Sequence, residues 1–364
     1  MNNGNANKDE IRLSSLIHLS MIMGVGYATV KQFVDQPEAL DIYGEGILAD
    51  SLGISRHITS IIKSKLNDAS YTEWVKKERE NWVKEGVGLL SWWDPLYPEQ
   101  LRHIHQAPYL LFYKGNLEYL YQPKIAIVGT RNPTPYGQRV AQRFAEQLSQ
   151  YGVTVVSGMA RGIDGLAHQG ALRYGGKSIG VIAGGFRTIY PPEYSQLYKQ
   201  MGKEGLLLSE YPPHIKPHPS YFPLRNRLIS GLSDGVIVVE AAKKSGSLIT
   251  ADLALEQGKE VFCVPGSIFS PQSEGTHNLI KQGATLITDW KEIFDHAPQL
   301  QTQERVMQLE HAPILQALRN HGRLYPDQLA ELTGIPLVQI MVALLQLELE
   351  QWIDRLPGGS YEIR

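Results

Sequence analysis

The chain has 364 residues, 43% hydrophobic residues and a formal net charge of −2, values typical of a globular protein with two or three domains. It contains no run of about 18 apolar residues, so we expect no membrane span. Its single cysteine, Cys263, excludes a disulfide within the chain, and the cytoplasm is the expected compartment. Because the net charge is close to zero, nucleic-acid binding would require positive residues focused in one groove.

The N-terminal third is predicted to be mainly helical. Residues 1–10 are polar and are predicted to form a disordered tail, whereas residues 11–70 show an interrupted helical pattern. Residues 24–26, Gly-Val-Gly, separate two apolar helical segments. This is typical of a helix-hairpin-helix turn that offers backbone amides to a DNA phosphate, or of a tight turn in a small bundle. Residues 71–122 mix a charged helix with short apolar runs and are predicted to extend the domain that follows.

The central part alternates apolar runs with helical patterns. The runs are KIAIVG, VTVVSG, SIGVIAGG, GLLLSE, GVIVVEA, EVFCVPG and ATLIT. In an intervening segment, Val140, Phe144 and Leu148 recur every four residues and give a helix one apolar stripe. Apolar strands that alternate with helices predict an α/β domain, with a doubly wound, mostly parallel sheet covered on both faces, over residues 123–298.

The C-terminal part is predicted to be a separate small domain. Residues 299–309 are polar and read as a linker, and residues 310–364 contain three helical patterns followed by a Pro-Gly-Gly turn. This order is typical of a winged helix. Its third helical stretch has no Lys or Arg and carries Glu348 and Glu350, whereas a DNA-reading helix is usually basic. The pattern therefore favours a protein-docking or regulatory role for this domain.

Polar residues and glycines follow several of the predicted strands. In doubly wound sheets ligands bind at the carboxyl ends of the strands, so these residues share one edge. A helix that begins after the fifth run adds backbone amides, which favour an anion. The candidate residues from three strand ends are Gly129, Thr130, Arg131, Ser157, Gly158, Arg161, Gly162, Lys244, Ser245, Gly246 and Ser247. Together they predict a phosphate site, although singly each glycine could only permit a turn and Ser247 could only cap a helix.

The stretch YFPLRNRLISGLS, residues 221–233, adds further candidates. Its helical apolar stripe includes Arg225 but not Asn226 or Arg227. A buried arginine needs a partner, either a carboxylate such as Asp164 or Glu240 or a ligand phosphate. The pattern favours a structural role for Arg225 and a ligand role for Arg227. Phe222 is expected either to stack on a base or to pack in the core.

Several sequence blocks together resemble the DprA family, the bacterial DNA-processing protein A, also called Smf. They lie between about residues 88 and 290: DPLYPEQLRHI, PYLLFYKGN, IAIVGTR, VSGMARGIDGLAHQGAL, FPLRNRLISGLSDGVIVVEAAKKSGSLITADLALEQGKEVFCVPG and GTHNLIKQGATLI. The resemblance implies an extended Rossmann-like domain that binds single-stranded DNA, an N-terminal sterile-alpha-motif-like helical domain and a C-terminal winged helix. It also implies a homodimer built through the Rossmann-like domain.

The resemblance further implies a function. The protein would protect incoming single strands and load the RecA recombinase onto them during natural transformation. The DNA pocket would centre on the arginine of a Gly-Ser/Thr-Arg motif, here Arg131, with Phe222, Arg225 and Arg227 nearby. The turn after the first strand would then accept a strand's phosphate and not a pyrophosphate cofactor.

Enzymatic chemistry is not expected. The sequence lacks G-x-G-x-x-G after the first strand, a G-x-x-x-x-G-K-[ST] loop and any Cys and His spacing that suits a metal, so we expect neither a cofactor nor a metal. The rival class is the Rossmann-like nucleotide phosphoribohydrolases of the lysine decarboxylase-like type. These place a glycine-rich turn before a helix with a downstream glutamate, which Glu256 could mimic. They carry P-G-G-x-G-T at that turn, whereas this chain has KSGSLIT.

Overall fold

The computed structural model describes residues 3–43, 52–173, 175–300, 312–349 and 352–363. The chain forms two compact units, Met1–His296 and Ala297–Arg364, which are treated separately below. Most of the predicted linker, residues 301–309, lies outside the described residues.

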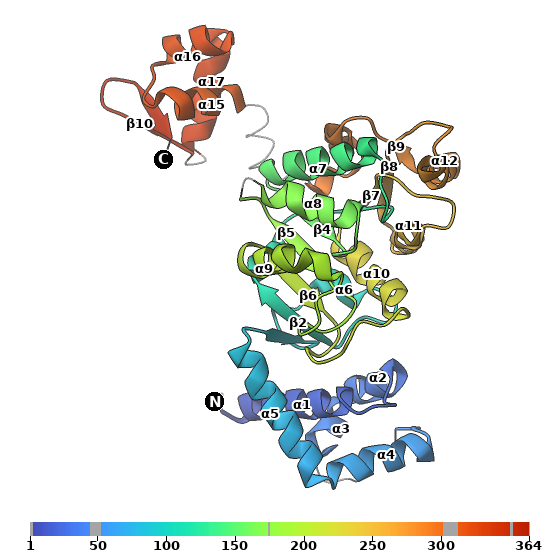
Figure 1. Ribbon diagram of the computed structural model, residues 1–364. Coiled ribbons are helices and arrows are strands. Elements are labelled where there is room, and N and C mark those ends of the chain that lie inside the picture. Colours follow the sequence, from blue (N-terminus) through green and yellow to red (C-terminus); the bar gives the residue numbers. More distant parts are fainter. Residues whose placement is uncertain (1–2, 44–51, 174, 301–311, 350–351, 364) are drawn as a thin grey trace. The chain divides into compact units, whose positions relative to one another are not determined.

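In the described part of residues 3–84, the first unit forms helices α1 to α5 (Figure 1). They are α1 (Asn3–Ser20), α2 (Tyr27–Asp35), α3 (Pro37–Asp41), α4 (Arg56–Leu66) and α5 (Ala69–Lys84). Because α1 begins at Asn3, the prediction of a disordered tail is wrong for residues 3–10. The apolar residues Leu16, Ile17 and Leu19 anchor α1 in the core, and a helix extends readily from an anchored turn since each added residue gains a hydrogen bond.

These helices share a hydrophobic core with the first strands of the sheet. Trp82 of α5 packs edge-on against Phe112, with ring centroids 5.0 Å apart, and Tyr109 and Leu110 join the same core. The domain boundary that we expected between residues 70 and 71 falls inside α5. The turn before α2 depends on Gly24, whose φ of +90° is a conformation that favours glycine.

The centre of the unit is a nine-stranded sheet with the order β1-β2-β6-β5-β4-β3-β7-β8-β9. Its strands are β1 (Gly88–Ser91), β2 (Leu110–Gly115), β3 (Lys124–Val128), β4 (Thr154–Ser157), β5 (Ser178–Val181), β6 (Leu206–Ser209), β7 (Gly235–Val238), β8 (Glu260–Cys263) and β9 (Thr285–Leu286). Strands β3 to β9 pair in parallel, whereas β2 runs antiparallel to β1 and β6. The seven apolar runs form the parallel part, which confirms the predicted fold class.

Helices cover both faces of this sheet (Figure 1). The first layer is α7 (Pro135–Gln150), α8 (Ile163–Leu172) and α9 (Ser195–Glu204), and the second is α6 (Glu99–Arg102), α10 (Tyr221–Leu232) and α11 (Gly246–Glu256). Helices α12 (Glu274–Lys281) and α13 (Ile293–His296) follow β8 and β9. Strand order reverses between β3 and β7, so the carboxyl ends of these strands flank a topological switch point, where doubly wound folds bind ligands.

The second unit is a winged helix, as predicted. It contains α15 (Ala312–His321), α16 (Pro326–Thr333), α17 (Leu337–Leu349) and a hairpin of β10 (Ile353–Arg355) and β11 (Tyr361–Ile363). Of the α17 residues, Ile340, Leu344 and Leu347 fill the core of the unit, whereas Leu345 is 58% exposed.

Among the described residues, no single helix is long and apolar enough to cross a membrane. Helices α16 and α17 together have the length and composition of a broken span, with a bend of 114°. Their residues Leu329, Ile340 and Leu344 are nevertheless fully buried within the winged-helix core.

Candidate nucleic-acid interface

An open cavity of about 640 Å³ lies at the carboxyl ends of β3 and β7. Most of its lining comes from the loop after β3, the first turns of α10 and the turn that begins α11, and Ala160, Asp164 and Tyr190 complete it. Ten of the predicted site residues meet here: Gly129, Thr130, Arg131, Phe222, Arg225, Asn226, Lys244, Ser245, Gly246 and Ser247. Segments that are more than 100 residues apart in the sequence therefore converge at the switch point.

The loop after β3 is fixed by Glu240, a residue that is only 2% exposed at the end of β7. The backbone N–H and the hydroxyl of Thr134 donate to the two carboxylate oxygens of Glu240, at 2.9 and 2.5 Å. The backbone N–H of Thr130 donates to the carbonyl oxygen of Glu240 at 2.7 Å. Thr134 also caps α7 by accepting from the N–H of Gly137 at 3.2 Å. The turn that carries Arg131 is thus held on both sides.

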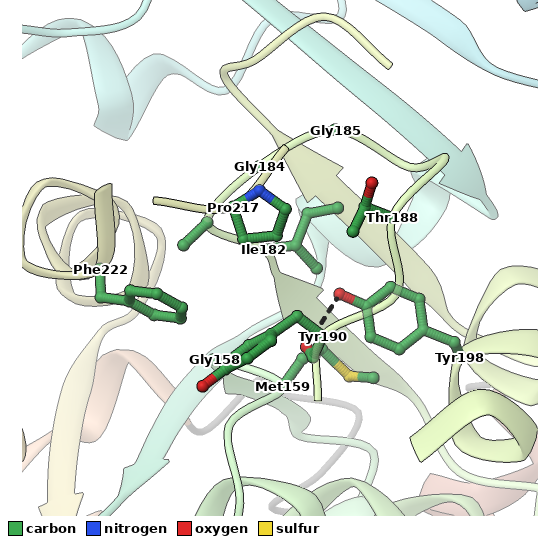
Figure 2. Close-up of a pocket in the computed structure, with 11 residues that line it drawn as sticks. Gly158, Met159, Ile182, Gly184, Gly185, Thr188, Tyr190, Tyr198, Pro217 and Phe222 are labelled. Carbon is green, nitrogen blue, oxygen red and sulfur yellow. Dashed lines mark hydrogen bonds between the residues drawn. The ribbon is translucent and has the colours of Figure 1, made fainter. Parts of the chain in front are cut away.

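Arg131 itself is exposed, and its guanidinium lies 5.5 Å from the centre of the Phe222 ring. The Tyr190 ring is 5.4 Å from Phe222 at an angle of 60°, and it borders the same cavity. Figure 2 shows Phe222 and Tyr190 side by side at a smaller neighbouring cavity, where the Tyr198 hydroxyl donates to the carbonyl of Tyr190. A guanidinium can grip a phosphate with two parallel hydrogen bonds, and the rings beside it can stack on bases.

Arg225 lies in the wall of the cavity and is 3% exposed. Its Nη1 donates to the carbonyl oxygens of Gly158 and Val181 at the ends of β4 and β5. The Asp164 carboxylate approaches Arg225 on the same side of Gly158, since a Cβ built there would be 2.6 Å from both side chains. Burial raises the pKa of the Asp164 carboxyl, against the opposing effect of the Arg225 charge. These contacts support the structural role that the sequence favoured for Arg225.

The start of α11 forms the opposite wall. Ser245 is the N-cap: its Oγ accepts from the N–H of Ser247 at 3.4 Å and lies 2.8 Å from the Ser247 hydroxyl. The Asn226 side chain donates to the carbonyl of Gly246 at 3.3 Å and ties this turn to α10. A Cβ at Gly246 would meet nothing within 4 Å, so the space above this helix start is open. Exposed Lys244 adds a positive charge beside it.

Three other predicted residues hold the scaffold together and do not line this cavity. Ser157 is fully buried, and its hydroxyl donates to the carbonyl of Ile127 at 2.7 Å, which ties β4 to β3. Gly158 lines the smaller cavity of Figure 2. Gly162, with φ of +76°, lets α8 approach the loop after β3, because a Cβ there would be 2.3 Å from the carbonyl oxygen of Thr130. Close backbone packing explains these positions.

Two predicted arginines also lie outside the cavity. Arg161 is exposed and pairs with Glu193. Arg227 is 8% exposed, and its Nη2 donates to the Glu210 carboxylate at 2.6 Å and to the carbonyl of Gln106 at 2.8 Å. The preference for Arg227 as a ligand is therefore not supported. Two residues along a helix correspond to a rotation of about 200°, so Arg225 and Arg227 face nearly opposite directions.

Sequence reasoning missed two residues that shape the site. Tyr190 lies in the loop after β5, within AGGFRTIYPPEY, and its only signal was an aromatic residue in a loop that follows a predicted strand. Glu240 was considered only as a partner for Arg225, yet it binds Thr134. Its signal was a carboxylate directly after a fully apolar strand. A charge buried at such a position must be paired or hydrogen-bonded to be stable.

The structure separates Glu256 from the cavity. Glu256 is exposed at the C-terminal end of α11, whereas the cavity receives the N-terminal end, about 15 Å away along the helix. His168 is fully buried, with Nδ1 2.8 Å from the Ser178 hydroxyl, and burial lowers its pKa to about 3. Within the described ranges, no group of three or more His, Cys, Asp or Glu side chains could hold a metal.

The fold and cavity define a Rossmann-like protein with an extended sheet and an open site at its switch point. Comparison with known proteins then identifies the family. Residues 88–298 match the family described as DNA recombination-mediator protein A, and residues 298–359 match the DprA winged helix domain. The chain belongs to this DprA/Smf family, as the sequence motifs indicated.

Individual relatives agree with this assignment. The chain is 48% identical to the DNA processing protein DprA of Bacillus subtilis over 221 residues, which cover 60% of this chain and 74% of the relative. It is 44% identical to the protein Smf of Escherichia coli over 281 residues, which cover 74% and 75% of the two chains.

Two solved structures are also similar. DNA processing protein A from Streptococcus pneumoniae has a TM-score of 0.67 and 35% identity, and the match covers 79% of this chain and 97% of that one. DNA processing protein A from Helicobacter pylori has a TM-score of 0.54 and 32% identity, with 58% and 96% covered. The latter structure is described as giving insights into a unique single-stranded DNA binding mode of that protein.

Proposed function

We propose that this protein binds single-stranded DNA in the cavity at the switch point. The observation that carries the proposal is the placement of Arg131 beside Phe222 and Tyr190 at the mouth of that cavity. A phosphate bound by Arg131 would lie next to rings on which bases can stack. The DNA-binding description of the Helicobacter pylori relative supports the same assignment.

The charge distribution supports a strand more than a small nucleotide. The whole chain has a net charge of −2, yet Arg131 and Lys244 both border this one open cavity. Electrostatic contact with phosphates and stacking on aromatic rings require no particular base. Binding should therefore be salt-dependent and show little sequence preference.

We further propose that the protein acts as a recombination mediator. The protein would shield the bound strand and deliver it to RecA during recombination in the cytoplasm, as a homodimer built through the Rossmann-like domain and without enzymatic turnover. Membership of the DNA recombination-mediator family supports this role. The distance of Glu256 from the cavity disfavours the phosphoribohydrolase alternative.

The decisive experiment is fluorescence anisotropy with labelled oligonucleotides at two salt concentrations. Single-stranded oligothymidine should bind more tightly than a duplex of equal length, and log Kd should rise with log salt by about 0.7 per phosphate contact. Equal affinity for single and double strands, or binding without salt dependence, would contradict the proposal.

The mediator role needs its own measurement. The protein should speed formation of RecA filaments on a labelled single strand, and it should release no base from nucleoside monophosphates. Unchanged filament formation would contradict delivery while leaving strand binding intact. Base release that disappears in Glu256→Gln would favour the enzyme class.

A further inference from the structure

A second cavity, of about 580 Å³, lies along the outer side of α7. Residues from Tyr136 to Gln147 of α7 form one wall, and Val264, Thr288 and Asp289, which follow β8 and β9, form the other. None of the predicted site residues borders it. We define this cavity as the α7 groove.

The α7 groove presents two arginines that no described carboxylate pairs with. Arg139 and Arg143 are exposed, one helical turn apart, and neither forms an ion pair with a residue that the structure describes. The lining also contains Arg173, Glu146 and Asp289, so three arginines face two carboxylates and the net charge of the groove is +1. Glu146 pairs with Arg173 at 3.4 Å, and Asp289 caps a helical turn by accepting from the N–H of Lys291 at 2.9 Å. The two free guanidiniums therefore offer sites for an anionic ligand.

The groove starts at the first turn of α7, close in sequence to Arg131, although it shares no lining residue with the first cavity. Helix α7 starts four residues after Arg131, and Tyr136 in its first turn is 42% exposed at the head of the groove. The Tyr136 hydroxyl donates to the carbonyl of Pro265 at 2.9 Å, which holds the ring in place. From Tyr136 to Gln147 the wall is about 16 Å long at 1.5 Å per residue. An elongated ligand could thus contact the loop of Arg131 and then both arginines of the groove.

We propose that the α7 groove binds the phosphates of the same DNA strand where it extends beyond the first cavity. Arg139 and Arg143 would be the phosphate ligands, and Tyr136 a surface for base stacking. The inference rests on the proposed function. Two arginines spaced along an open groove suit a polymer with repeated charges better than one small anion. An acidic protein segment is the competing ligand, and the test below separates the two.

The test measures strand length dependence in the full chain. Wild type and the double variant Arg139→Ala/Arg143→Ala are titrated with oligothymidines of about 6 and about 20 nucleotides. For the long strand, the double variant should lose about tenfold in affinity, and its salt slope should fall by about 1.4, the value for two phosphate contacts. The short strand, which fits the first cavity alone, should bind as tightly as to wild type.

The matched control is Lys199→Ala/Lys203→Ala. These two exposed cations are also one turn apart, on α9, and border neither cavity. This control should leave both affinities unchanged, and Arg139→Lys/Arg143→Lys should retain most of the salt slope. Thermal melting should confirm that each variant is folded.

Each outcome has one meaning. Wild-type affinity for the long strand in the double variant would overturn the groove assignment while leaving the first site intact. If the double variant bound the long strand with wild-type affinity but no longer stimulated RecA filament formation, the groove would be a protein-binding surface. Equal losses for both lengths would also overturn the assignment, because the arginines would then act on the first cavity. Failure of wild type to bind either strand would instead refute the proposed function.

Discussion

Replacement of Arg131 by alanine should weaken strand binding without unfolding the protein. Arg131 is exposed, and its guanidinium lies over the Phe222 ring. Glu240 holds the loop through the backbone of Thr130 and through Thr134, so the loop does not depend on the Arg131 side chain. The fold therefore loses little when the side chain is removed. A charge-assisted hydrogen bond to a phosphate contributes about 2 kcal/mol, so Kd should rise about 30-fold at low salt.

The salt dependence gives a second, independent number. One lost phosphate contact should lower the slope of log Kd against log salt by about 0.7. Arg131→Lys should keep most of this slope, because the charge remains, but should still lose affinity since lysine cannot form two parallel hydrogen bonds. Phe222→Ala should behave in the opposite way: it should lose about 1–3 kcal/mol of stacking and keep the slope.

Arg161→Ala is the matched control for this series. Arg161 is also exposed and follows a neighbouring strand, but it pairs with Glu193 and lies outside the cavity. Anisotropy titrations at three or more salt concentrations, with thermal melts of each variant, provide the comparison. The reasoning would be refuted by a folded Arg131→Ala protein that binds with wild-type affinity and slope, or by an equal loss in Arg161→Ala.

Arg227→Ala should reduce the free energy of unfolding in urea by about 3 kcal/mol, because it leaves the partly buried Glu210 carboxylate, whose side chain is 15% exposed, without its partner. Burial holds the pKa of His168 at about 3, below its ordinary value near 6.5, so stability should fall as pH drops from about 6.5 towards 3. In pH-dependent urea unfolding, His168→Asn should shallow that slope by up to about 1.4 kcal/mol per pH unit. A chain that ends after Leu300 should keep its single-strand affinity within about tenfold in titrations at matched salt, since residues 310–364 carry four Lys and Arg against seven Asp and Glu.

Each of these three predictions has a result that would contradict it. Unchanged urea stability in Arg227→Ala would mean that the Glu210 pair contributes nothing to the fold. An unchanged pH slope in His168→Asn would mean that other groups dominate the acid limb. A loss beyond about tenfold, or 1.4 kcal/mol, on truncation would mean that the winged helix contacts DNA.

The sequence predicted the parallel sheet well because its inner strands, such as β3 and β4, are buried on both faces and consist of continuous apolar runs. Strands β1 and β2 lacked this signal. Residues such as Tyr113 and Lys114 of β2 are only partly buried, so this antiparallel edge does not stand out from its mixed surroundings. The start of α1 was missed because its polar residues carry no periodicity, although the buried turn of Leu16 anchors them.

Residues whose positions follow from topology alone were correctly expected to lie together, while their binding role stays a prediction. Strand ends of a doubly wound sheet converge, so Arg131 and Ser247 could be placed together without coordinates. The ligand role expected for Arg227 is not supported, because a tertiary partner decides where its side chain lies. Glu210 lies after β6, and nothing in the local pattern shows that it binds Arg227. The same limit applies to Tyr190, whose ring is placed beside Phe222 by the loop after β5.

The position of Glu240 explains why the switch point of this fold is not suited to bind a dinucleotide. In that class, the pyrophosphate lies at the N-terminus of the helix after the first strand. Here the corresponding helix, α7, already has a fixed carboxylate at its N-terminus, where Glu240 accepts two hydrogen bonds from Thr134. A Cβ at Gly137, in the first turn of α7, would be only 2.3 Å from that carboxylate. An internal anion thus occupies the place of the pyrophosphate. Arg131 and the start of α11 with Lys244 lie further out and line the open cavity, where a DNA strand can reach them.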